Sequence, residues 1–283
     1  METSTSQELV QKYEKGEMRF SFGENWSRFL RVLSEERISQ AEQSLLSMLG
    51  RTSLTGTTFL DIGSGSGLFS LAAKRAGATR VHSFDFDPQS VACTAELRQR
   101  YFADDTGWIV ERASVLDQAY MASLDKFDVV YSWGVLHHTG QMWRAIELAS
   151  ERVKPGGQLF IAIYNDQGGV SRRWRSVKRL YNRVPKPIAT GIVVAIGLWR
   201  ESREALVSLI RRRNPLARWS GSTGRGMTVW YDLVDWVGGY PFEVAKPEEI
   251  FEFLSRRGFR LERMKTWGAG HACNEFVLTL ASR

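Results

Sequence analysis

The sequence predicts a doubly wound α/β domain built on a mostly parallel sheet. Three observations lead to this fold class. Short apolar runs alternate with stretches of helical periodicity, a cluster of glycines follows the first apolar run, and two further apolar runs close the chain. Strands that alternate with helices form βαβ units, whose helices cover both faces of a parallel sheet. The chain has 283 residues, of which 43% are hydrophobic, and can therefore bury a large core.

The elements follow one another in a regular order. Apolar residues spaced by three and four between 25 and 49 predict one or two amphipathic helices. Seven strands are expected, at 58–62, 80–84, 108–110, 127–132, 158–164, 259–266 and 274–281. Helices are expected at 68–76, 88–100, 142–153 and 247–257, and the sequence KPGG at 154–157 reads as a turn. A short loop joins the last two strands, so the last one is expected to run antiparallel.

The glycine cluster lies in the first strand-to-helix turn, within FLDIGSGSGLFSL. Three glycines in five positions are costly inside a strand or helix, so something must approach this backbone closely. In an open parallel sheet, ligands bind at the carboxyl ends of the strands, where this turn lies. Gly63, Gly65 and Gly67 lack the G-x-G-x-x-G spacing of nicotinamide sites, which disfavours an oxidoreductase.

Two carboxylates near the turn indicate the chemistry of the ligand. Asp61 precedes the glycines, where it would repel a pyrophosphate and attract an ammonium group. Asp85 ends the second strand, at a suitable distance to accept hydrogen bonds from ribose hydroxyls. Together they suit a nucleoside with a cationic tail. Asp87 precedes Pro88 and is expected to cap the next helix.

Five segments, in order, resemble the motifs of class I S-adenosylmethionine-dependent methyltransferases. These are LDIGSGSG, VHSFDFDP, VERASVLD, FDVVYSWGVLHH and VKPGGQLFIAIYN. The resemblance is close between 50 and 165, where the chain is also similar to the O-methyltransferases of ubiquinone biosynthesis. It implies a Rossmann-like sheet of seven strands and S-adenosyl-L-methionine as the cofactor.

The resemblance also implies residues of the cofactor site. Those implied for the amino-acid end of the cofactor are Asp61, Gly63, Ser64, Gly65 and Gly67, with Asp85 for the ribose. Those implied for the adenine side and the fourth-strand motif are Phe86, Ser114, Val115, Ser132 and Trp133. Many relatives carry an acid where this chain has Ser114, and Asp117 is a nearby competitor for the adenine amino group.

Methyl transfer from a sulfonium requires aligned, desolvated partners, and a base when a hydroxyl is the acceptor. His137 and His138 follow the fourth strand, where a neutral imidazole can take that proton. Adjacent side chains diverge, so one of them is expected to face the pocket, and His137 is preferred. Alternatively, both histidines pack and hydrogen-bond within their loop. The four histidines and two cysteines show no metal-ligand spacing, so no metal is expected.

Two aromatic segments, 19–26 and 231–243, are candidates to cover the site. The first ends in Trp26, and the glycines at 238 and 239 of the second would aim Tyr240 inward. We expect both aromatic residues, together with Arg172 from the basic segment described next, to contact the acceptor. The alternative is that the aromatics belong to the core.

The strand and helix alternation is interrupted after the fifth strand by a basic segment. Fourteen Lys or Arg and three acids lie between 166 and 226, whereas the whole chain carries +7. This excess could meet RNA phosphates, an anionic acceptor or anionic lipid headgroups, or form a solvated helix face. No RNA-binding module is recognisable, which disfavours nucleic acid. The apolar run 188–199 is too short to span a bilayer but suits an interface.

We therefore expect an S-adenosylmethionine-dependent methyltransferase that acts on a small-molecule or lipid-linked acceptor, at oxygen or at nitrogen. The alternatives are an RNA or protein methyltransferase and a noncatalytic module that binds the cofactor. The expected parts are an N-terminal helical cap (1–57), a cofactor-binding half (58–165), a basic helical insertion or lid (166–246) and a C-terminal helix and strand pair (247–283). Two distant cysteines and a polar N-terminus predict a cytoplasmic protein, either free or peripheral at a membrane.

Overall fold

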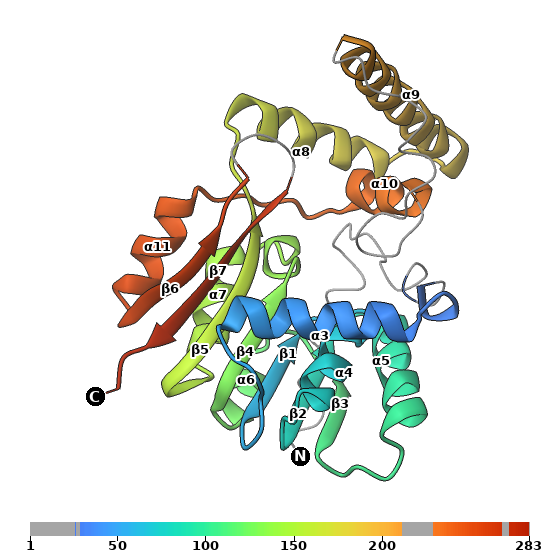
Figure 1. Ribbon diagram of the computed structural model, residues 1–283. Helices are drawn as coiled ribbons and strands as arrows, with labels where there is room; N and C mark the ends of the chain where they lie inside the picture. Colours follow the sequence, from blue (N-terminus) through green and yellow to red (C-terminus); the bar gives the residue numbers. More distant parts are fainter. Residues whose placement is uncertain (1–25, 27–28, 211–228, 268–271, 283) are drawn as a thin grey trace.

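The computed structural model describes residues 26, 29–210, 229–267 and 272–282. Seven strands form one sheet in the order β3-β2-β1-β4-β5-β7-β6 (Figure 1). The strands are β1 (Thr58–Ile62), β2 (Arg80–Asp85), β3 (Trp108–Arg112), β4 (Phe127–Trp133), β5 (Val153–Tyr164), β6 (Phe259–Lys265) and β7 (Cys273–Leu280). Strand β7 is antiparallel to β5 and β6, and the other pairs are parallel. This confirms the predicted fold class.

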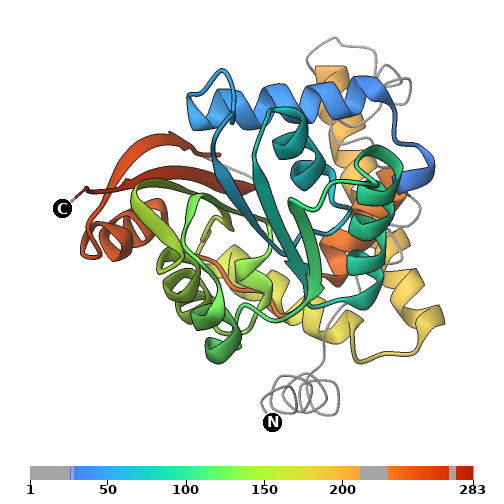
Figure 2. The same cartoon turned by 90° about the horizontal axis from the view of Figure 1, so that it is seen from below.

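Helices cover both faces of the sheet (Figure 2). One face carries α3 (Glu35–Leu49), α4 (Leu68–Arg75) and α5 (Pro88–Tyr101), and the other α6 (Gln118–Ser123), α7 (Met142–Ser150) and α11 (Pro247–Ser255). Side chains of a strand alternate between faces, so Phe59 packs toward α3–α5 while Leu60 and Ile62 pack toward α6, α7 and α11. Both faces are buried in the centre of the sheet, which explains why β1, β4 and most of β5 are apolar, whereas the edge strand β6 carries exposed charged side chains.

Local hydrogen bonds fix where several helices begin. Asp87 caps α5 by accepting from the Gln89 N–H, with Pro88 in the first turn, as predicted. Helix α6 begins at Asp117, which accepts from the Tyr120 N–H. The sequence analysis missed this helix because its six residues are too few to show a helical period.

The stretch 25–49, predicted as one or two helices, is interrupted before α3, which starts after the capping side chain of Ser34. One boundary differs from the sequence prediction. The segment 154–157 lies within β5 rather than before it, because pairing with β4 begins at Val153 and then shifts register. The result is a bulge at the start of β5.

Three helices interrupt the sheet between β5 and α11. They are α8 (Gly169–Tyr181), α9 (Lys186–Ile210) and α10 (Val229–Gly238), and they lie beyond the carboxyl ends of the strands (Figure 1). In the described part of this segment they share a small buried cluster of Val193, Leu233 and Val237. We call α8, α9 and α10 the inserted helices. No helix among the described residues has the length and apolar character needed to cross a bilayer.

The inserted helices leave and rejoin the sheet at one place. Asn165 and Ala245 form a parallel β-bridge, and the Asp166 N–H donates to the Ala245 carbonyl at 3.1 Å. The Ala245 N–H in turn donates to the Tyr164 carbonyl at 3.0 Å. The segment is therefore attached through a two-stranded stem at the end of β5.

Candidate active site

The three glycines of the first turn have left-handed backbone conformations, with φ of 75° at Gly63, 56° at Gly65 and 80° at Gly67. Any other residue would be strained at these angles. A Cβ at Gly63 would overlap the Val135 side chain, and a Cβ at Gly67 would lie 2.8 Å from Cα of Thr94. The close approach predicted from the sequence is therefore made, at these two positions, by the protein itself.

Gly65 differs because its neighbour is an aromatic ring. A Cβ at this position would lie 3.1 Å from the indole of Trp26, which is half-buried. Trp26, expected at the acceptor, thus lies over the glycine turn. In this position the indole covers Gly65, one of the residues that the sequence resemblance implies for the cofactor.

The Asp85 side chain stabilises the backbone of the glycine turn. Its carboxylate accepts the Gly65 N–H and the Asp87 N–H, each at 2.9 Å. Burial raises the pKa of Asp85 to about 6. A carboxylate has about four acceptor positions, so two backbone donors leave capacity for ribose hydroxyls.

Asp61 lies behind the turn at the end of β1. It accepts a hydrogen bond from the Ser70 hydroxyl, which also contacts Ser83. Burial raises the pKa of Asp61 to about 7, and the nearby charge of Asp85 contributes. Two desolvated carboxylates so close together favour a positively charged ligand.

The expected adenine contacts lie at the ends of β2 and β3. The Ala113 N–H donates to the Asp85 carbonyl, which brings Ser114 beside Phe86. Both Phe86 and Ser114 are half-buried. Val115 points into the core between the sheet and α6, so only its backbone can meet a ligand.

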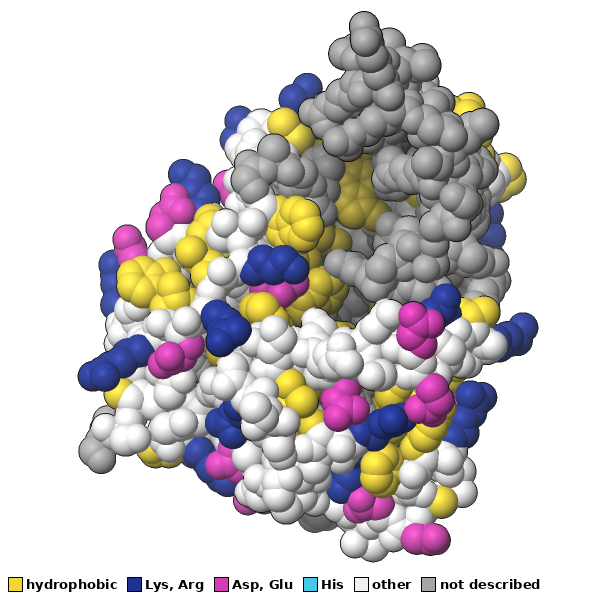
Figure 3. Space-filling model, viewed as in Figure 1, with side chains coloured by type: hydrophobic (Ala, Val, Ile, Leu, Met, Phe, Trp, Pro, Cys, Tyr) yellow, Lys and Arg dark blue, Asp and Glu magenta, His cyan; other side chains and the backbone are white. Residues whose placement is uncertain are grey.

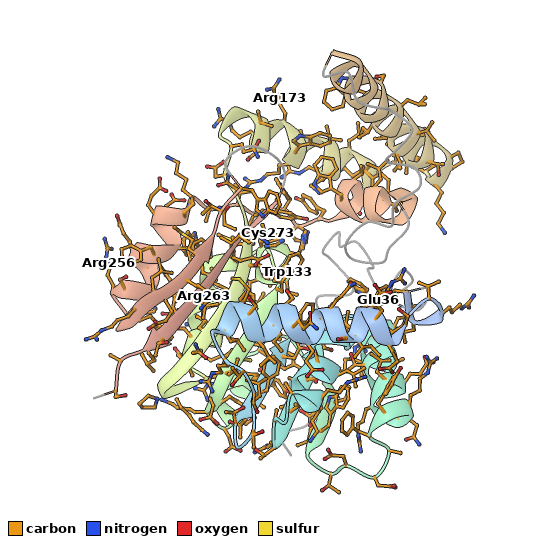
Figure 4. All side chains as sticks on the ribbon, in the orientation of Figure 1. Glu36, Trp133, Arg173, Arg256, Arg263 and Cys273 are labelled. Carbon is orange, nitrogen blue, oxygen red and sulfur yellow. The ribbon has the colours of Figure 1, made fainter. Side chains whose placement is uncertain are left out.

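The fourth-strand residues serve different roles. Ser132 is fully buried and donates to the Ile62 carbonyl at 2.9 Å, which ties β4 to the residue just before the glycine turn. Trp133 is half-buried at the carboxyl end of β4, between the sheet and the inserted helices (Figure 4). Figure 3 shows hydrophobic side chains at the surface on this side of the molecule.

The two histidines occupy a 3-10 turn, η1 (Leu136–His138), directly after β4. His138 is half-buried, and its Nδ1 lies 2.6 Å from the Pro241 carbonyl oxygen. A carbonyl can only accept, so Nδ1 carries the proton and the lone pair is on Nε2. His138 is thus held in the tautomer that a general base requires.

His137 is fully buried, and neither ring nitrogen makes a hydrogen bond of ordinary geometry. Its ring centroid lies 4.0 Å from that of Tyr164 and 4.4 Å from that of His138. Burial, followed by the charges of His138 and Lys178, lowers the pKa of His137 well below its usual value. His137 is therefore a neutral ring. The alternative that both histidines pack and hydrogen-bond within their loop therefore agrees with the packing of His137 but does not account for its lack of an ordinary hydrogen bond.

Lys178 is a site residue that the sequence analysis missed. It was counted among the basic residues of the insertion, yet the structure buries it completely against the Trp236 carbonyl. Trp174 and Tyr181 lie four residues before and three after it, on the same face of α8. This aromatic spacing was the signal in the sequence.

The other two predicted acceptor residues are both near α8. The Tyr240 hydroxyl lies 3.3 Å from Nε of Arg179 and is held at the edge of α8. Arg172 is exposed on α8, and its neighbour Arg173 points away from the sheet (Figure 4). The structure therefore does not bring Arg172 to the histidines.

The described residues also bear on two other kinds of site. They contain no group of three His, Cys, Asp or Glu side chains placed to hold a metal ion. A cavity of about 400 Å³ lies beside Arg51, Gln158 and Arg263, near the C-terminal end of α3. It includes none of the residues predicted for the cofactor or the acceptor.

A sheet in this order, with a glycine turn after β1 and an acid after β2, defines a Rossmann-like domain that binds an adenosine-containing ligand. The profile of a family described as "Methyltransferase domain" matches residues 33–214. The chain belongs to this family and is a class I S-adenosylmethionine-dependent methyltransferase. This finding overrides the noncatalytic and oxidoreductase alternatives.

Curated relatives match part of the chain. Ubiquinone biosynthesis O-methyltransferase of Methylobacterium sp. (strain 4-46) is 31% identical over 117 residues, which are 41% of this chain and 45% of the relative. Ribosomal protein L11 methyltransferase of Burkholderia thailandensis is 28% identical over 153 residues, which are 54% of this chain and 42% of the relative. The chain thus spans less than half the length of these relatives.

The fold extends further than the sequence match. Magnesium protoporphyrin IX methyltransferase from Synechocystis PCC 6803, solved with bound SAH, superposes with a TM-score of 0.56 at 14% identity. The superposition covers 97% of this chain and 100% of that one. The cofactor is S-adenosyl-L-methionine, and the turn fits it, because a glycine backbone in left-handed conformations and two carboxylates, buried Asp61 and half-buried Asp85, meet at the carboxyl edge of the sheet.

Proposed function

We propose that this enzyme methylates an oxygen atom of a small-molecule or lipid-linked acceptor, with His138 as the general base. The hydrogen bond between His138 Nδ1 and the Pro241 carbonyl carries this proposal. It fixes the tautomer whose Nε2 can take a hydroxyl proton, at the edge of the sheet that holds the glycine turn. The O-methyltransferase among the relatives is consistent with this chemistry.

His138 is preferred to His137 because a base must stabilise the charge it acquires. Protonated His137 would be buried and near the charge of Lys178, both of which oppose the imidazolium. His138 is half-buried and has a carbonyl oxygen on its N–H, which stabilises an imidazolium. We therefore assign the proton to His138 and a positioning role to His137.

The remaining residues of the chain bind and align the reactants. The cofactor, when bound, supplies a methyl group activated by the sulfonium. Asp85 holds the ribose, Asp61 offers negative charge to the cationic end, and Trp26 covers the turn and excludes water. The inserted helices close over the acceptor, since Tyr164 and the 240–243 segment connect them to the histidines.

We also propose that the inserted helices contact an anionic lipid surface. Helix α9 exposes Ile188 (55%), Leu198 (67%) and Trp199 (57%) to solvent. Exposed arginines, among them Arg172 and Arg173, lie on the adjacent α8. Apolar side chains beside cationic ones suit the boundary between headgroups and acyl chains.

A polyanionic macromolecule is the alternative partner for the same arginines. One relative is named as a methyltransferase of a ribosomal protein, and exposed cations of α8 could also meet RNA or an acidic protein. The apolar exposure on α9 favours lipid, because nucleic acid offers little to such side chains.

Turnover tests the proposed reaction. Formation of S-adenosylhomocysteine is measured with separate panels of phenols, carboxylic acids and amines. With a phenol acceptor, His138→Gln should lower kcat by about 10²-fold or more and remove the acidic limb of the pH profile. His137→Gln is the matched control and should keep that limb. Loss of the acidic limb in both variants, or methylation of amines alone, would contradict the proposal.

A further inference from the structure

Lys178 occupies an unusual place for a lysine. Its neighbours Arg172, Arg173, Arg175 and Arg179 on α8 are exposed, whereas Lys178 has no exposed surface. Removing an ammonium group from water is unfavourable unless its surroundings stabilise the charge. The basic composition of the segment therefore does not explain why Lys178 is buried.

The surroundings of Lys178 stabilise a positive charge. Its Nζ donates to the Trp236 carbonyl and lies over three aromatic rings. The distances from Nζ to the ring centroids are 4.8 Å for Phe242, 4.9 Å for Trp236 and 5.9 Å for Tyr164. Aromatic faces attract cations, most strongly where water is excluded.

Tyr164 connects this ammonium group with His137. The Tyr164 ring lies against both, with its centroid 4.0 Å from that of His137. Neither nitrogen of the buried His137 ring makes a hydrogen bond of ordinary geometry, and the interaction with the Ala162 backbone is the one backbone contact that acts on its pKa. More than nine in ten buried polar groups in proteins have a well-formed hydrogen bond. A neutral ring without a well-formed hydrogen bond and a buried cation thus both contact Tyr164 at the end of β5, close enough for the Lys178 charge to lower the pKa of His137.

We propose that Lys178 and His137 recognise an acidic oxygen on the acceptor, a phenol or a carboxylic acid. This inference rests on the proposed oxygen transfer and names the class of acceptor. An anionic oxygen would pair with the Lys178 ammonium and accept a hydrogen bond from the neutral His137 ring. An alkylamine acceptor would be protonated at neutral pH and repelled by Lys178, and a neutral arylamine would lack the negative charge that Lys178 attracts.

The reaction balances for both kinds of acceptor. The oxygen forms a bond to the methyl carbon as the sulfur–methyl bond breaks, and the electron pair of that bond stays on sulfur. A carboxylate reacts without losing a proton. A phenol transfers its proton to His138, and the adjacent ammonium group makes the phenol more acidic.

The acceptor reaches this pair when the inserted helices separate from the sheet. Both side chains are fully covered in this structure, by η1 and Tyr164 on one side and by α8, α10 and Phe242 on the other. The stem at Asn165 and Ala245 is the attachment about which such a movement would occur.

Binding of nitrobenzene derivatives tests the inference without turnover. The probes are 4-nitrophenol, 4-nitrobenzoate and 4-nitroaniline, titrated in the presence of saturating S-adenosylhomocysteine. The wild-type protein should bind at least one of the two acidic probes roughly tenfold or more tightly than 4-nitroaniline. The one that binds more tightly shows whether the acceptor is a phenol or a carboxylic acid, and bound 4-nitrophenol should show the visible absorbance of its phenolate.

Two variants locate the effect. Lys178→Met keeps the length of the side chain and should abolish the preference for acidic probes, while S-adenosylhomocysteine affinity and melting temperature report that the protein is folded. Lys186→Met removes an exposed lysine from the same segment and should leave the preference unchanged. A wild-type protein that binds 4-nitroaniline as tightly as the acidic probes overturns the inference, whatever the variants do. An unchanged preference in folded Lys178→Met also overturns it.

These outcomes are separable from failure of the proposed function. Absence of the acidic-probe preference in the wild type, or its persistence in folded Lys178→Met, refutes the role of Lys178 and leaves oxygen transfer to be judged by turnover. Normal turnover by His138→Gln refutes the proposed base. The probe affinities then still test the role of Lys178 independently.

Discussion

The sheet and the inserted helices bury their side chains in very different ways. The sheet has two large buried clusters, one on each face, that draw on every strand and on six helices. Within the described residues, the inserted helices share a cluster of Val193, Leu233 and Val237 and expose large apolar side chains on α9. A region with few buried contacts opens more readily than the rest of a protein. The cofactor side is therefore expected to be rigid and the acceptor side to move.

Stability measurements provide the strongest test of this comparison. Leu60→Ala removes a fully buried side chain from the sheet and should lower the free energy of unfolding by about 2–5 kcal/mol. Leu233→Ala should lower the global value by less than about 1 kcal/mol, if the inserted helices unfold first. Chemical denaturation measures the global free energy of unfolding, and hydrogen exchange measures the local opening of α10. Equal global losses would show that the two regions unfold as one.

Cofactor binding should depend on the sheet alone. Asp85→Ala removes the carboxylate that holds the Gly65 N–H and should weaken S-adenosylhomocysteine binding by about 1–3 kcal/mol, because charge-assisted hydrogen bonds are lost. The triple variant Arg172→Gln, Arg173→Gln, Arg175→Gln should bind as the wild type does. Isothermal titration calorimetry measures both. A loss in the triple variant would show that the inserted helices contribute to the cofactor site.

The pH dependence of cofactor binding should reveal Asp61. Its pKa is raised to about 7, so in the free protein it gains charge as the pH rises from 6 to 8. The ammonium group of S-adenosylhomocysteine favours the ionised form, so affinity for this ligand should rise roughly tenfold over this range and binding should release a proton. Asp61→Asn should flatten the profile. A flat profile in the wild type would remove Asp61 from contact with the ligand's charge.

The same shift has a consequence for stability. The pKa of Asp61 is higher in the folded than in the unfolded protein, so the protein without cofactor should lose stability as the pH rises through about 7. The increase in melting temperature caused by S-adenosylhomocysteine should accordingly be larger at pH 8 than at pH 6. Thermal scans at the two pH values, with Asp61→Asn as the control, measure this difference.

Changes in liposome binding should be the smallest of these effects. They should arise from the inserted helices alone. At low salt, Leu198→Ser or the triple arginine variant should reduce binding to vesicles with anionic lipid by roughly threefold to tenfold. Binding should weaken as salt is added, because charges on the surface are screened. Flotation with purely zwitterionic vesicles is the control. Wild-type binding by both variants would reduce the arginines to a solvated helix face.

The sequence predicted the cofactor side better than the acceptor side, for a physical reason. The glycine turn, Asp61 and Asp85 lie within one βαβ unit, where local spacing fixes geometry. The burial of Lys178 and the tautomer of His138 depend instead on Trp236 and Pro241, which are far away in the sequence. Basic composition marked the segment of Lys178 but could not tell a buried lysine from exposed arginines.

Details of the cofactor side also depended on contacts outside its motifs. The sequence predicted that something approaches the glycines, but not that Val135, Thr94 and Trp26 do so. The roles implied for Ser132 and Val115 came from the resemblance. In the structure the first is a tie between strands and the second a core side chain with only its backbone available.

The bridge between Asn165 and Ala245 makes the inserted helices a separable insertion in the sheet domain. Because the chain departs and returns at neighbouring backbone positions, a segment of any length can be accommodated there without moving β5 against β7. Exchange of the inserted helices between related proteins would then change the substrate range and leave the adenosine-binding sheet unaltered. In protein engineering, the same two positions are the natural junctions for grafting the inserted helices onto another methyltransferase sheet.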